Sequence, residues 1–260
     1  MRNDVVAIVP AAGIGARFGH GEGKLFARLR GEPLLLHTLR ALQAIPDIRW
    51  IVLAVREDER ERLQALLRTH RITKALPLCA GGASRAESVA RGFEVVPRAA
   101  KWVLVHDGAR PCVSLALIAG AIRAAKKAGA VACGLPASLT VKAVDDRREV
   151  RLTLDREHLW FMQTPQVFRR DWFVQALQRA NGQLVGLPDD AALLEMAGFR
   201  VSVIPGDPLN IKVTTQEDLM LAEAILSSRP SIPSVRQFRR TDRRTRRTRR
   251  TDERQFISMT

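Results

Sequence analysis

The sequence predicts an α/β protein in which a parallel sheet carries helices on both faces. Short β-branched runs such as Val5–Val9 and Trp50–Val55 alternate with helical segments such as Leu34–Ala44. This alternation repeats along the chain, and repeated strand–helix units form parallel sheets. Ligands of such sheets bind at the carboxyl ends of the strands. A loop containing Gly13 and Gly15 follows the first strand, so this end is the expected ligand side.

Local signals place the elements of the first half. Pro33 suits the first turn of a helix at 34–44. Ser84 and Glu87 have the spacing of a capping box, which predicts a helix that begins after a glycine pair. Ser114 is expected to cap an alanine-rich helix that ends near Gly129. The remaining patterns predict a helix at 58–69 and strands at 72–79, 102–105 and 131–135.

Between residues 136 and 163 the alternation stops. Leu139–Val144 and Val150–Leu154 are typical of a β-hairpin around Asp145–Arg148. Two isolated strands are marginally stable in water, so the hairpin is expected to need a partner, the simplest being a second copy of the chain. The pattern then predicts helices at 171–179 and 189–198, a strand at 199–204, and a last helix, ending near residue 226, capped by Thr214 and Glu217.

Composition separates a basic tail from the rest of the chain. The 260 residues carry a net charge of +15. Residues 229–260 hold eleven arginines and three carboxylates, so this tail contributes +8 and residues 1–228 contribute +7. The tail has too little apolar surface to offset chain entropy, and we expect it to be disordered by itself. A moderately basic body suits an anionic substrate.

Neither a membrane nor an export function is indicated. No apolar run reaches the roughly 18 residues of a membrane span, and the N-terminus lacks a signal-peptide pattern. Cys79, Cys112 and Cys133 are odd in number and scattered, which predicts reduced thiols and a cytoplasmic location.

The loop after the first strand is the strongest functional signal. It reads Pro10-Ala11-Ala12-Gly13-Ile14-Gly15-Ala16-Arg17, and Lys24 follows seven residues later. Small residues let the backbone approach a ligand closely, and successive amides form a concavity that suits phosphate oxygens. A P-loop would need Gly-Lys before Ser or Thr, and a dinucleotide loop would need a third glycine where Phe18 stands. The pattern, with its two cations, therefore predicts a different kind of nucleoside triphosphate site.

Two later residues are expected at the same end of the sheet. Asp107 follows the strand at 102–105, and a carboxylate beside a triphosphate is a natural Mg²⁺ ligand, because Mg²⁺ takes few carboxylates and several phosphate oxygens. Lys212 stands just before a helix N-terminus, a place suited to phosphate. His106 is assigned a structural role.

Five motifs occur in one order along the chain. They are the glycine loop with Arg17 and Lys24, Gly-Gly…Arg…Ser-Val at 81–89, Val-His-Asp-Gly-Ala-Arg-Pro at 105–111, Gln-Thr-Pro-Gln-x-Phe at 163–168, and Asn-Ile-Lys-Val-Thr at 210–214. Together they closely resemble the 2-C-methyl-D-erythritol 4-phosphate cytidylyltransferase family over about residues 4–226. The resemblance implies a Rossmann-like nucleotidyltransferase fold in a domain at 1–228, with a protruding β-arm at about 136–160 that builds a homodimer. It also implies transfer of CMP from CTP to the methylerythritol phosphate, with Mg²⁺ and release of pyrophosphate, in non-mevalonate isoprenoid synthesis.

The resemblance assigns roles to individual residues. It implies nucleotide binding by Ala11, Ala12, Gly13, Gly82 and Ser88, and catalysis by Arg17, Lys24 and Lys212. It implies a Mg²⁺ ligand at Asp107 and substrate binding by Arg110, Thr140, Arg156 and Thr164, with Thr140 and Arg156 coming from the partner's arm.

Two other functions are open at this point. A sibling cytidylyltransferase acting on another polyol phosphate, such as ribitol 5-phosphate, would share the catalytic loops and differ in the arm; Thr140 and Arg156 favour the methylerythritol phosphate. A nucleic-acid-binding protein could act through phosphate neutralisation by the tail, but the tail has no aromatic interleaving apart from Phe238 and Phe256. Nucleic acid is therefore expected, at most, as a non-specific partner of the tail.

Overall fold

The first strand, β1 (Val5–Ala11), lies within a seven-stranded sheet of order β11-β7-β10-β6-β1-β4-β5. This computed structural model describes residues 4–13, 18 and 23–229. β1 pairs in parallel with β4 and with β6, in the register Val5↔Ile48 and Val5↔Trp102. The strands of this sheet after β1 are β4 (Ile48–Val55), β5 (Cys79–Ala80), β6 (Trp102–Val105), β7 (Ala130–Pro136), β10 (Trp160–Arg169) and β11 (Ser202–Pro205).

The sheet is mixed, because β10 runs antiparallel between β6 and β7. The sequence patterns did not predict this strand. After β7 the chain makes its excursion through the hairpin and returns at the same end of the sheet, where Trp160 pairs with Pro136. Without a crossover helix the returning strand has to run in the opposite direction.

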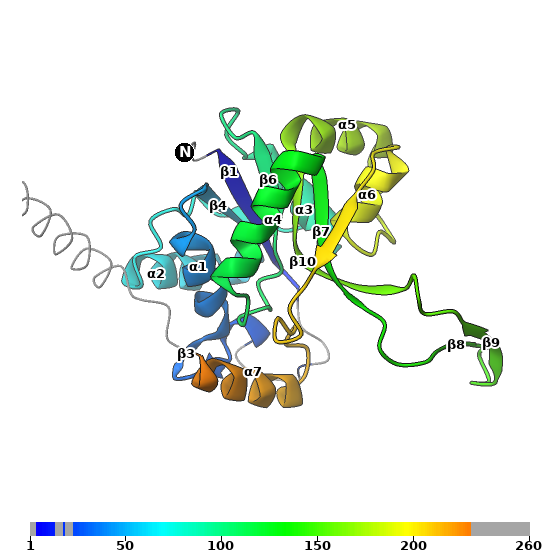
Figure 1. The fold of residues 1–260 in the computed structure, drawn as a ribbon. Helices are drawn as coiled ribbons and strands as arrows, with labels where there is room; N and C mark the ends of the chain where they lie inside the picture. The colour runs from blue at the N-terminus through cyan, green and yellow to red at the C-terminus, as the bar shows by residue number, and fades with distance from the viewer. Residues whose placement is uncertain (1–3, 14–17, 19–22, 230–260) are drawn as a thin grey trace, which may run out of the picture. The chain divides into compact units, whose positions relative to one another are not determined.

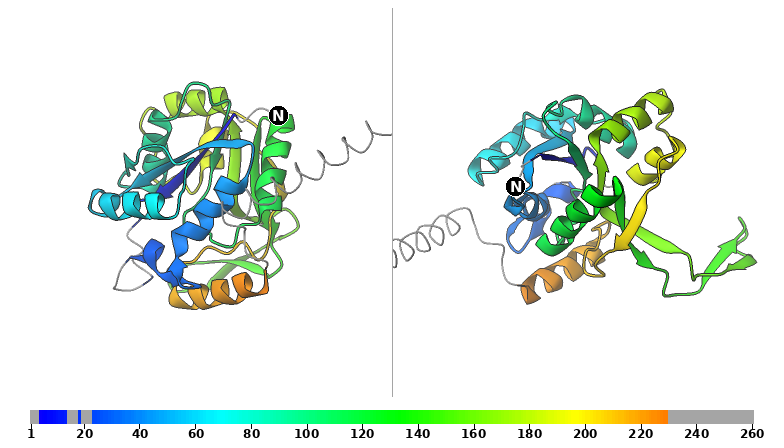
Figure 2. Two further views of the ribbon diagram at one scale, coloured as in Figure 1. Left: turned by 90° about the vertical axis from the view of Figure 1, so that its left-hand side faces the viewer. Right: turned by 45° about the horizontal axis from the view of Figure 1, so that its top comes forward.

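Helices cover both faces of the sheet, as predicted (Figures 1 and 2). On one face, buried side chains of β1 such as Val6 and Ile8 pack with Val89 of α3, Phe173 of α5 and Leu194 of α6. α1 and α4 lie on the other face, where α4 packs on β7 and β10. The α-helices are α1 (Leu34–Ala44), α2 (Arg60–Thr69), α3 (Arg85–Glu94), α4 (Leu115–Ala128), α5 (Arg170–Ala180), α6 (Asp190–Met196) and α7 (Gln216–Ser228); two 3₁₀ turns are Lys24–Phe26 and Glu57–Glu59.

Four short strands form two small sheets beside the main one. β2 (Arg28–Leu29) pairs with β3 (Glu32–Pro33). β8 (Val141–Val144) pairs with β9 (Val150–Leu154) as the predicted hairpin, with Val141 opposite Leu154. In the described sheets β8 and β9 pair only with each other, and every residue of β9 is exposed (Figure 1).

Two sequence predictions are wrong in detail. The strand expected at 72–79 is reduced to Cys79–Ala80 and a single bridge between Ile51 and Ala75, because Pro77 has no N–H to donate to β4. The capping box of α7 is Thr215 with Asp218, not Thr214 with Glu217. The Asp218 N–H donates to Thr215 Oγ1 at 3.3 Å, and Asp218 Oδ2 accepts from the Thr215 N–H at 3.0 Å. Asp218 Oδ2 also accepts from both the backbone and the hydroxyl of Thr214, which favours this register.

Contacts divide the chain into two units, Met1–Ser228 and Arg229–Thr260. The second unit, apart from Arg229, lies outside the described residues, and so does the predicted site residue Arg17. None of the helices in the described part of the chain is long and apolar enough to span a bilayer. Cys79, Cys112 and Cys133 carry free thiols.

Candidate active site

The carboxyl ends of β1, β4 and β6 open into one cleft. Its volume is about 620 Å³. The lining brings together residues that are as far apart in sequence as Ala11 and Lys212. Eight predicted site residues line it, namely Ala11, Ala12, Gly13, Lys24, Gly82, Ser88, Asp107 and Lys212. Arg56 and Arg85 also line the cleft and were not among the predicted site residues.

The glycine pair and the first loop touch because both are made of small residues. A Cβ added at Gly81 would lie 2.1 Å from the Cβ of Ala12, so no side chain fits there. The hydroxyl of Ser88 accepts from the Gly82 N–H at 2.9 Å and donates to the Ser84 carbonyl at 2.9 Å, which holds the turn onto α3. Ser84 accepts from the Glu87 N–H at 3.1 Å, as the predicted cap. α3 therefore begins at the cleft, where its N-terminus favours anions.

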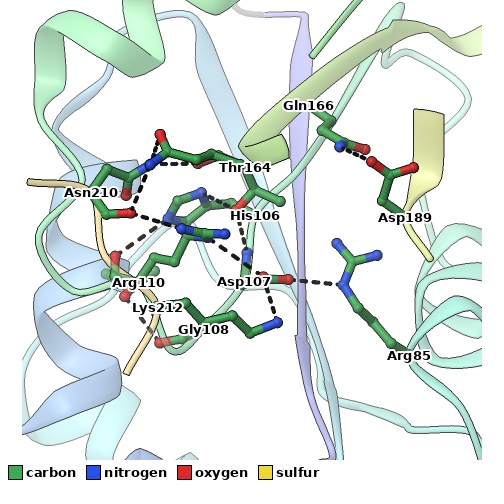
Figure 3. Close-up of polar contacts among 12 residues, drawn as sticks. Arg85, His106, Asp107, Gly108, Arg110, Thr164, Gln166, Asp189, Asn210 and Lys212 are labelled. Carbon is green, nitrogen blue, oxygen red and sulfur yellow. Dashed lines mark hydrogen bonds and ion pairs between the residues drawn. The ribbon is translucent and has the colours of Figure 1, made fainter. Parts of the chain in front are cut away.

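Asp107 is the charged centre of the cleft (Figure 3). Its side chain is only 9% exposed and meets three cations, with Arg85 Nε 2.9 Å from Oδ1, and Lys212 Nζ 2.9 Å and Arg110 Nε 3.6 Å from Oδ2. Burial alone would raise the pKa of this carboxyl, but Arg85, then Lys212 and Arg110, hold it well below its usual range. Asp107 is thus ionised at neutral pH, and it holds Lys212 at the cleft.

Thr164 and Arg110 do not line the cleft; both are buried and contact the residues around Asp107 (Figure 3). Thr164 Oγ1 accepts from the Asp107 N–H at 3.1 Å and lies 3.0 Å from His106 Nδ1. Arg110 Nη1 donates to the Asn210 carbonyl at 2.7 Å. Burial lowers the pKa of His106 to about 4, so this ring is neutral and structural, as expected. Thr164 therefore holds the backbone of Asp107, and Arg110 holds the segment at Asn210 that leads to Lys212.

The motif Gln163-Thr164-Pro165-Gln166 of β10 connects three parts of the site, of which Asp107, held by Thr164, is the first. Gln163 donates to the Asp207 carbonyl at 3.1 Å and accepts from the Asp207 N–H at 3.2 Å, which holds the segment that leads to Lys212. Gln166 Oε1 accepts from the N–H groups of Asp190 and Ala191 at 3.1 and 3.0 Å, which holds the N-terminus of α6. The sequence contained this motif, but β10 itself was not predicted, so the roles of the two glutamines were missed.

The site residues predicted on the hairpin excursion lie elsewhere. Thr140 precedes β8 and Arg156 follows β9, and both are exposed. Neither lines the cleft of its own chain. Arg156 Nη1 donates to the Ser138 carbonyl at 2.5 Å across the base of the hairpin.

The donor set of the cleft fits a hard divalent cation of the Mg²⁺ type. Among the described residues there is no cluster of three or more His, Cys, Asp or Glu side chains that could chelate a metal. Asp107 is the one carboxylate lining the cleft in that part of the chain. One carboxylate in a cleft that is also lined by cations matches Mg²⁺, which is bound through one or two carboxylates plus substrate phosphates.

A small-residue loop, a cation-lined cleft and a lone carboxylate at the strand ends of a mixed α/β sheet define a nucleotidyltransferase. The model of the 2-C-methyl-D-erythritol 4-phosphate cytidylyltransferase family matches residues 5–228, and the chain belongs to this family. The predicted α/β nucleotidyltransferase class is thereby confirmed, with a mixed sheet in place of a parallel one, while the protruding β-arm stays a prediction.

Individual relatives are similar to this chain along most of their own length. A 2-C-methyl-D-erythritol 4-phosphate cytidylyltransferase from Desulforamulus reducens is 40% identical over 227 residues, which is 87% of this chain and 97% of the relative. One from Alkaliphilus metalliredigens is 40% identical over 86% of this chain and 94% of the relative. The crystal structure of the Francisella tularensis enzyme of the same name superposes with a TM-score of 0.73 and 31% identity, over 85% of this chain and 99% of that one. The chain is an enzyme of the nucleotidyltransferase class.

Proposed function

We propose that this chain transfers CMP from CTP to 2-C-methyl-D-erythritol 4-phosphate and releases pyrophosphate, in non-mevalonate isoprenoid synthesis. The observation that carries the proposal is the cleft that gathers eight residues from four of the five sequence motifs, within a family match over 5–228. The sibling reaction on ribitol 5-phosphate is not favoured, because the named relatives act on the methylerythritol phosphate.

CTP would bind with its phosphates over the loop Ala11–Gly13 and its base near the Gly82 turn. The loop supplies backbone N–H groups, and the N-terminus of α3 adds a favourable dipole. Gly82 and Ser88 line the same cleft beside this loop, so one nucleotide could contact both groups. Arg17 is assigned to the phosphates by the family pattern alone.

The chemistry needs charge neutralisation more than a base. The phosphate monoester of the acceptor is already a nucleophile, and the obstacle is repulsion between two anions at the α-phosphate of CTP. Catalysis then consists of positioning and of cations aimed where negative charge builds up. Lys24 and Lys212 line the cleft from opposite ends of the chain and would supply this charge together with Arg17.

Asp107 would hold Mg²⁺ through one carboxylate oxygen. When bound, the cation would neutralise phosphate charge and orient the triphosphate. Lys212, whose Nζ lies 2.9 Å from Asp107 Oδ2, would contact the reacting phosphates. Arg85 would keep its contact with the other oxygen, Oδ1, at 2.9 Å.

Thr140 and Arg156 would complete the acceptor site of a partner chain. They are exposed and outside the cleft of their own chain, which is what a shared site requires. The hairpin also exposes an apolar face, with Val150, Leu152 and Leu154 exposed by 58, 56 and 37%. A homodimer through β8 and β9 would bury these side chains and deliver the two polar residues.

Residues 1–228 would form the catalytic domain of a cytoplasmic enzyme, and the tail at 229–260 would be dispensable. The free thiols of Cys79, Cys112 and Cys133 support the location. Deletion of 230–260 should leave turnover unchanged and abolish salt-sensitive binding of non-specific RNA. Loss of turnover in the shortened chain would instead assign the tail to the enzyme.

The test of the reaction is pyrophosphate release with CTP and Mg²⁺, measured in parallel with methylerythritol phosphate and ribitol 5-phosphate. Release with the first acceptor alone is expected. Release with the second alone would transfer the function to the sibling reaction and keep the roles of the cations. No release with either would refute both cytidylyltransferase assignments.

A further inference from the structure

Arg85 is a bridge between two buried carboxylates. Its Nε lies 2.9 Å from Oδ1 of Asp107, and its Nη1 lies 2.9 Å from Oδ2 of Asp190. The side chains of Asp107 and Asp190 are 9 and 2% exposed, whereas that of Arg85 is 26% exposed and reaches the cleft. A planar guanidinium can serve two carboxylates at once, which a lysine ammonium at the same place could do less rigidly.

Asp190 is itself held firmly. It is the first residue of α6, and Gln166 Oε1 accepts from its N–H at 3.1 Å, while the Gln166 amide donates to Asp189 Oδ2 at 2.8 Å. Asp189 caps the helix by accepting from the Ala192 N–H at 2.9 Å. The carboxylate of Asp190 therefore stands on a helix end fixed to β10, and it does not line the cleft.

The cluster around Asp107 carries more cations than anions. Arg85, Arg110 and Lys212 all face Asp107, and Arg85 also meets Asp190. Burial raises the pKa of Asp190, and its Oδ2, like Arg85 Nη2 and Arg110 Nε, is a buried atom without a hydrogen bond among the described residues, so the contact between Arg85 and Asp190 is an ion pair. Loss of the Asp190 carboxyl would remove one of the two anchors of Arg85, and the guanidinium would no longer be held against Oδ1 of Asp107.

We propose that Asp190 is a positioning residue of the nucleotidyl-transfer site, which acts through Arg85 to fix Oδ1 of Asp107 and so leaves Oδ2 for Lys212 or a divalent cation. The inference rests on the proposed function, because that function assigns the divalent cation to Asp107. It assigns Asp190 no contact with CTP or with the acceptor. Its effect should therefore appear in cation binding and should depend on Arg85.

The first experiment measures binding of Mn²⁺ to the full chain, with and without CTP, from the electron paramagnetic resonance signal of the free ion. Asp190→Asn should weaken Mn²⁺ binding by about 10-fold to 100-fold, the usual effect of removing an outer partner of a metal ligand. Asp190→Glu keeps the charge and should recover part of the loss. CTP binding measured in EDTA should stay near native, because Asp190 does not line the cleft.

A double-mutant cycle tests the route through Arg85. In an Arg85→Gln background, Asp190→Asn should add no further loss of Mn²⁺ binding, whereas independent effects would multiply. Asp171→Asn is the matched control, since this exposed carboxylate in the first turn of α5 pairs with Arg169 away from the cleft; it should bind Mn²⁺ like the native chain. If Asp190→Asn does not fold, Arg85→Lys provides the same test, because one ammonium cannot span both carboxylates as the guanidinium does.

Each outcome decides the proposal. Native Mn²⁺ binding in Asp190→Asn, or multiplied losses in the double variant, would overturn it. Equal loss of CTP binding in EDTA would overturn it too, because Asp190 would then support the cleft as a whole. The proposed function fails separately, if the native chain releases no pyrophosphate while these binding results stand.

Discussion

The carboxylate of Asp107 is buried among three cations, whereas every residue of β9 is exposed. The cleft is assembled from the ends of several strands and helices, and Asp107, Arg85, Ser88 and Lys212 each contact another residue of the same chain. The β8–β9 hairpin pairs in the described sheets only with itself. The comparison teaches that the charged groups of the cleft are assembled within one chain. The proposed binding of the acceptor by Thr140 and Arg156 would instead require a second chain, because neither residue lines the cleft of its own chain.

The largest effect is expected from Lys24 in the cleft. Lys24→Ala should lower kcat by about 10²-fold or more, as loss of one transition-state donor does, with little change in the dimer. Stopped-flow or steady-state pyrophosphate release measures this. A kcat close to native would remove Lys24 from the mechanism. It would also contradict the view that the cations of the cleft carry the catalysis.

Arg156 tests whether the hairpin serves a partner. Arg156→Ala should raise the KM for the acceptor by about 10-fold to 100-fold, because a charged hydrogen bond to phosphate is lost. The KM for CTP should change little, because Arg156 does not line the cleft.

Mixing the two impaired variants, assayed with the acceptor well below its native KM, extends the same test. In a heterodimer of Lys24→Ala and Arg156→Ala chains, one of the two shared sites keeps both native residues, so re-equilibrated mixtures should recover about a quarter of native activity. Activity that stays at the level of the separate variants would mean that each site is built within one chain.

The apolar face of the hairpin should govern assembly. Leu152, which is 56% exposed and pairs with Ala143, would be buried in the proposed dimer. Leu152→Lys should weaken the dimer by at least about tenfold in its dissociation constant, because buried leucine surface is lost on both chains. Sedimentation velocity across protein concentrations measures it, with Arg147→Ala in the turn as the control. A native chain that is monomeric at micromolar concentration would refute the shared site.

The smallest effect is expected at the cap of α3. Ser84→Ala should lower the free energy of unfolding by about 1 kcal/mol through loss of the N-cap. Ser114→Ala removes the equivalent cap of α4, where Ser114 accepts from the Leu117 N–H at 3.2 Å, and should cost a similar amount. Only Ser84→Ala should also raise the KM for CTP, because Ser84 lines the cleft. Urea denaturation and CTP kinetics on both variants separate the two effects. If the two variants have equal KM values for CTP, the cap of α3 does not contribute to nucleotide binding.

Much of the cleft could be predicted because it depends on local patterns and on one topological rule. Ala11–Gly13, Asp107 and Lys212 each follow a strand or precede a helix, and the ends of parallel strands meet at one edge. The exact depth of a residue could not be predicted in this way. Thr164 and Arg110, for example, are buried and do not line the cleft, because their partners, His106 and Asn210, come from distant segments.

By itself, then, the sequence determined the α/β class, the caps of α3 and α4, and the hairpin, since all of these are signalled by residues close together in the chain. Only the tertiary structure decided the antiparallel course of β10 and the pairing of Arg85 with both Asp107 and Asp190. The physical reason is that a buried charge takes its partners from whatever the fold places beside it. Segments more than a hundred residues apart, such as those of Asp107 and Lys212, meet only when the whole sheet has formed.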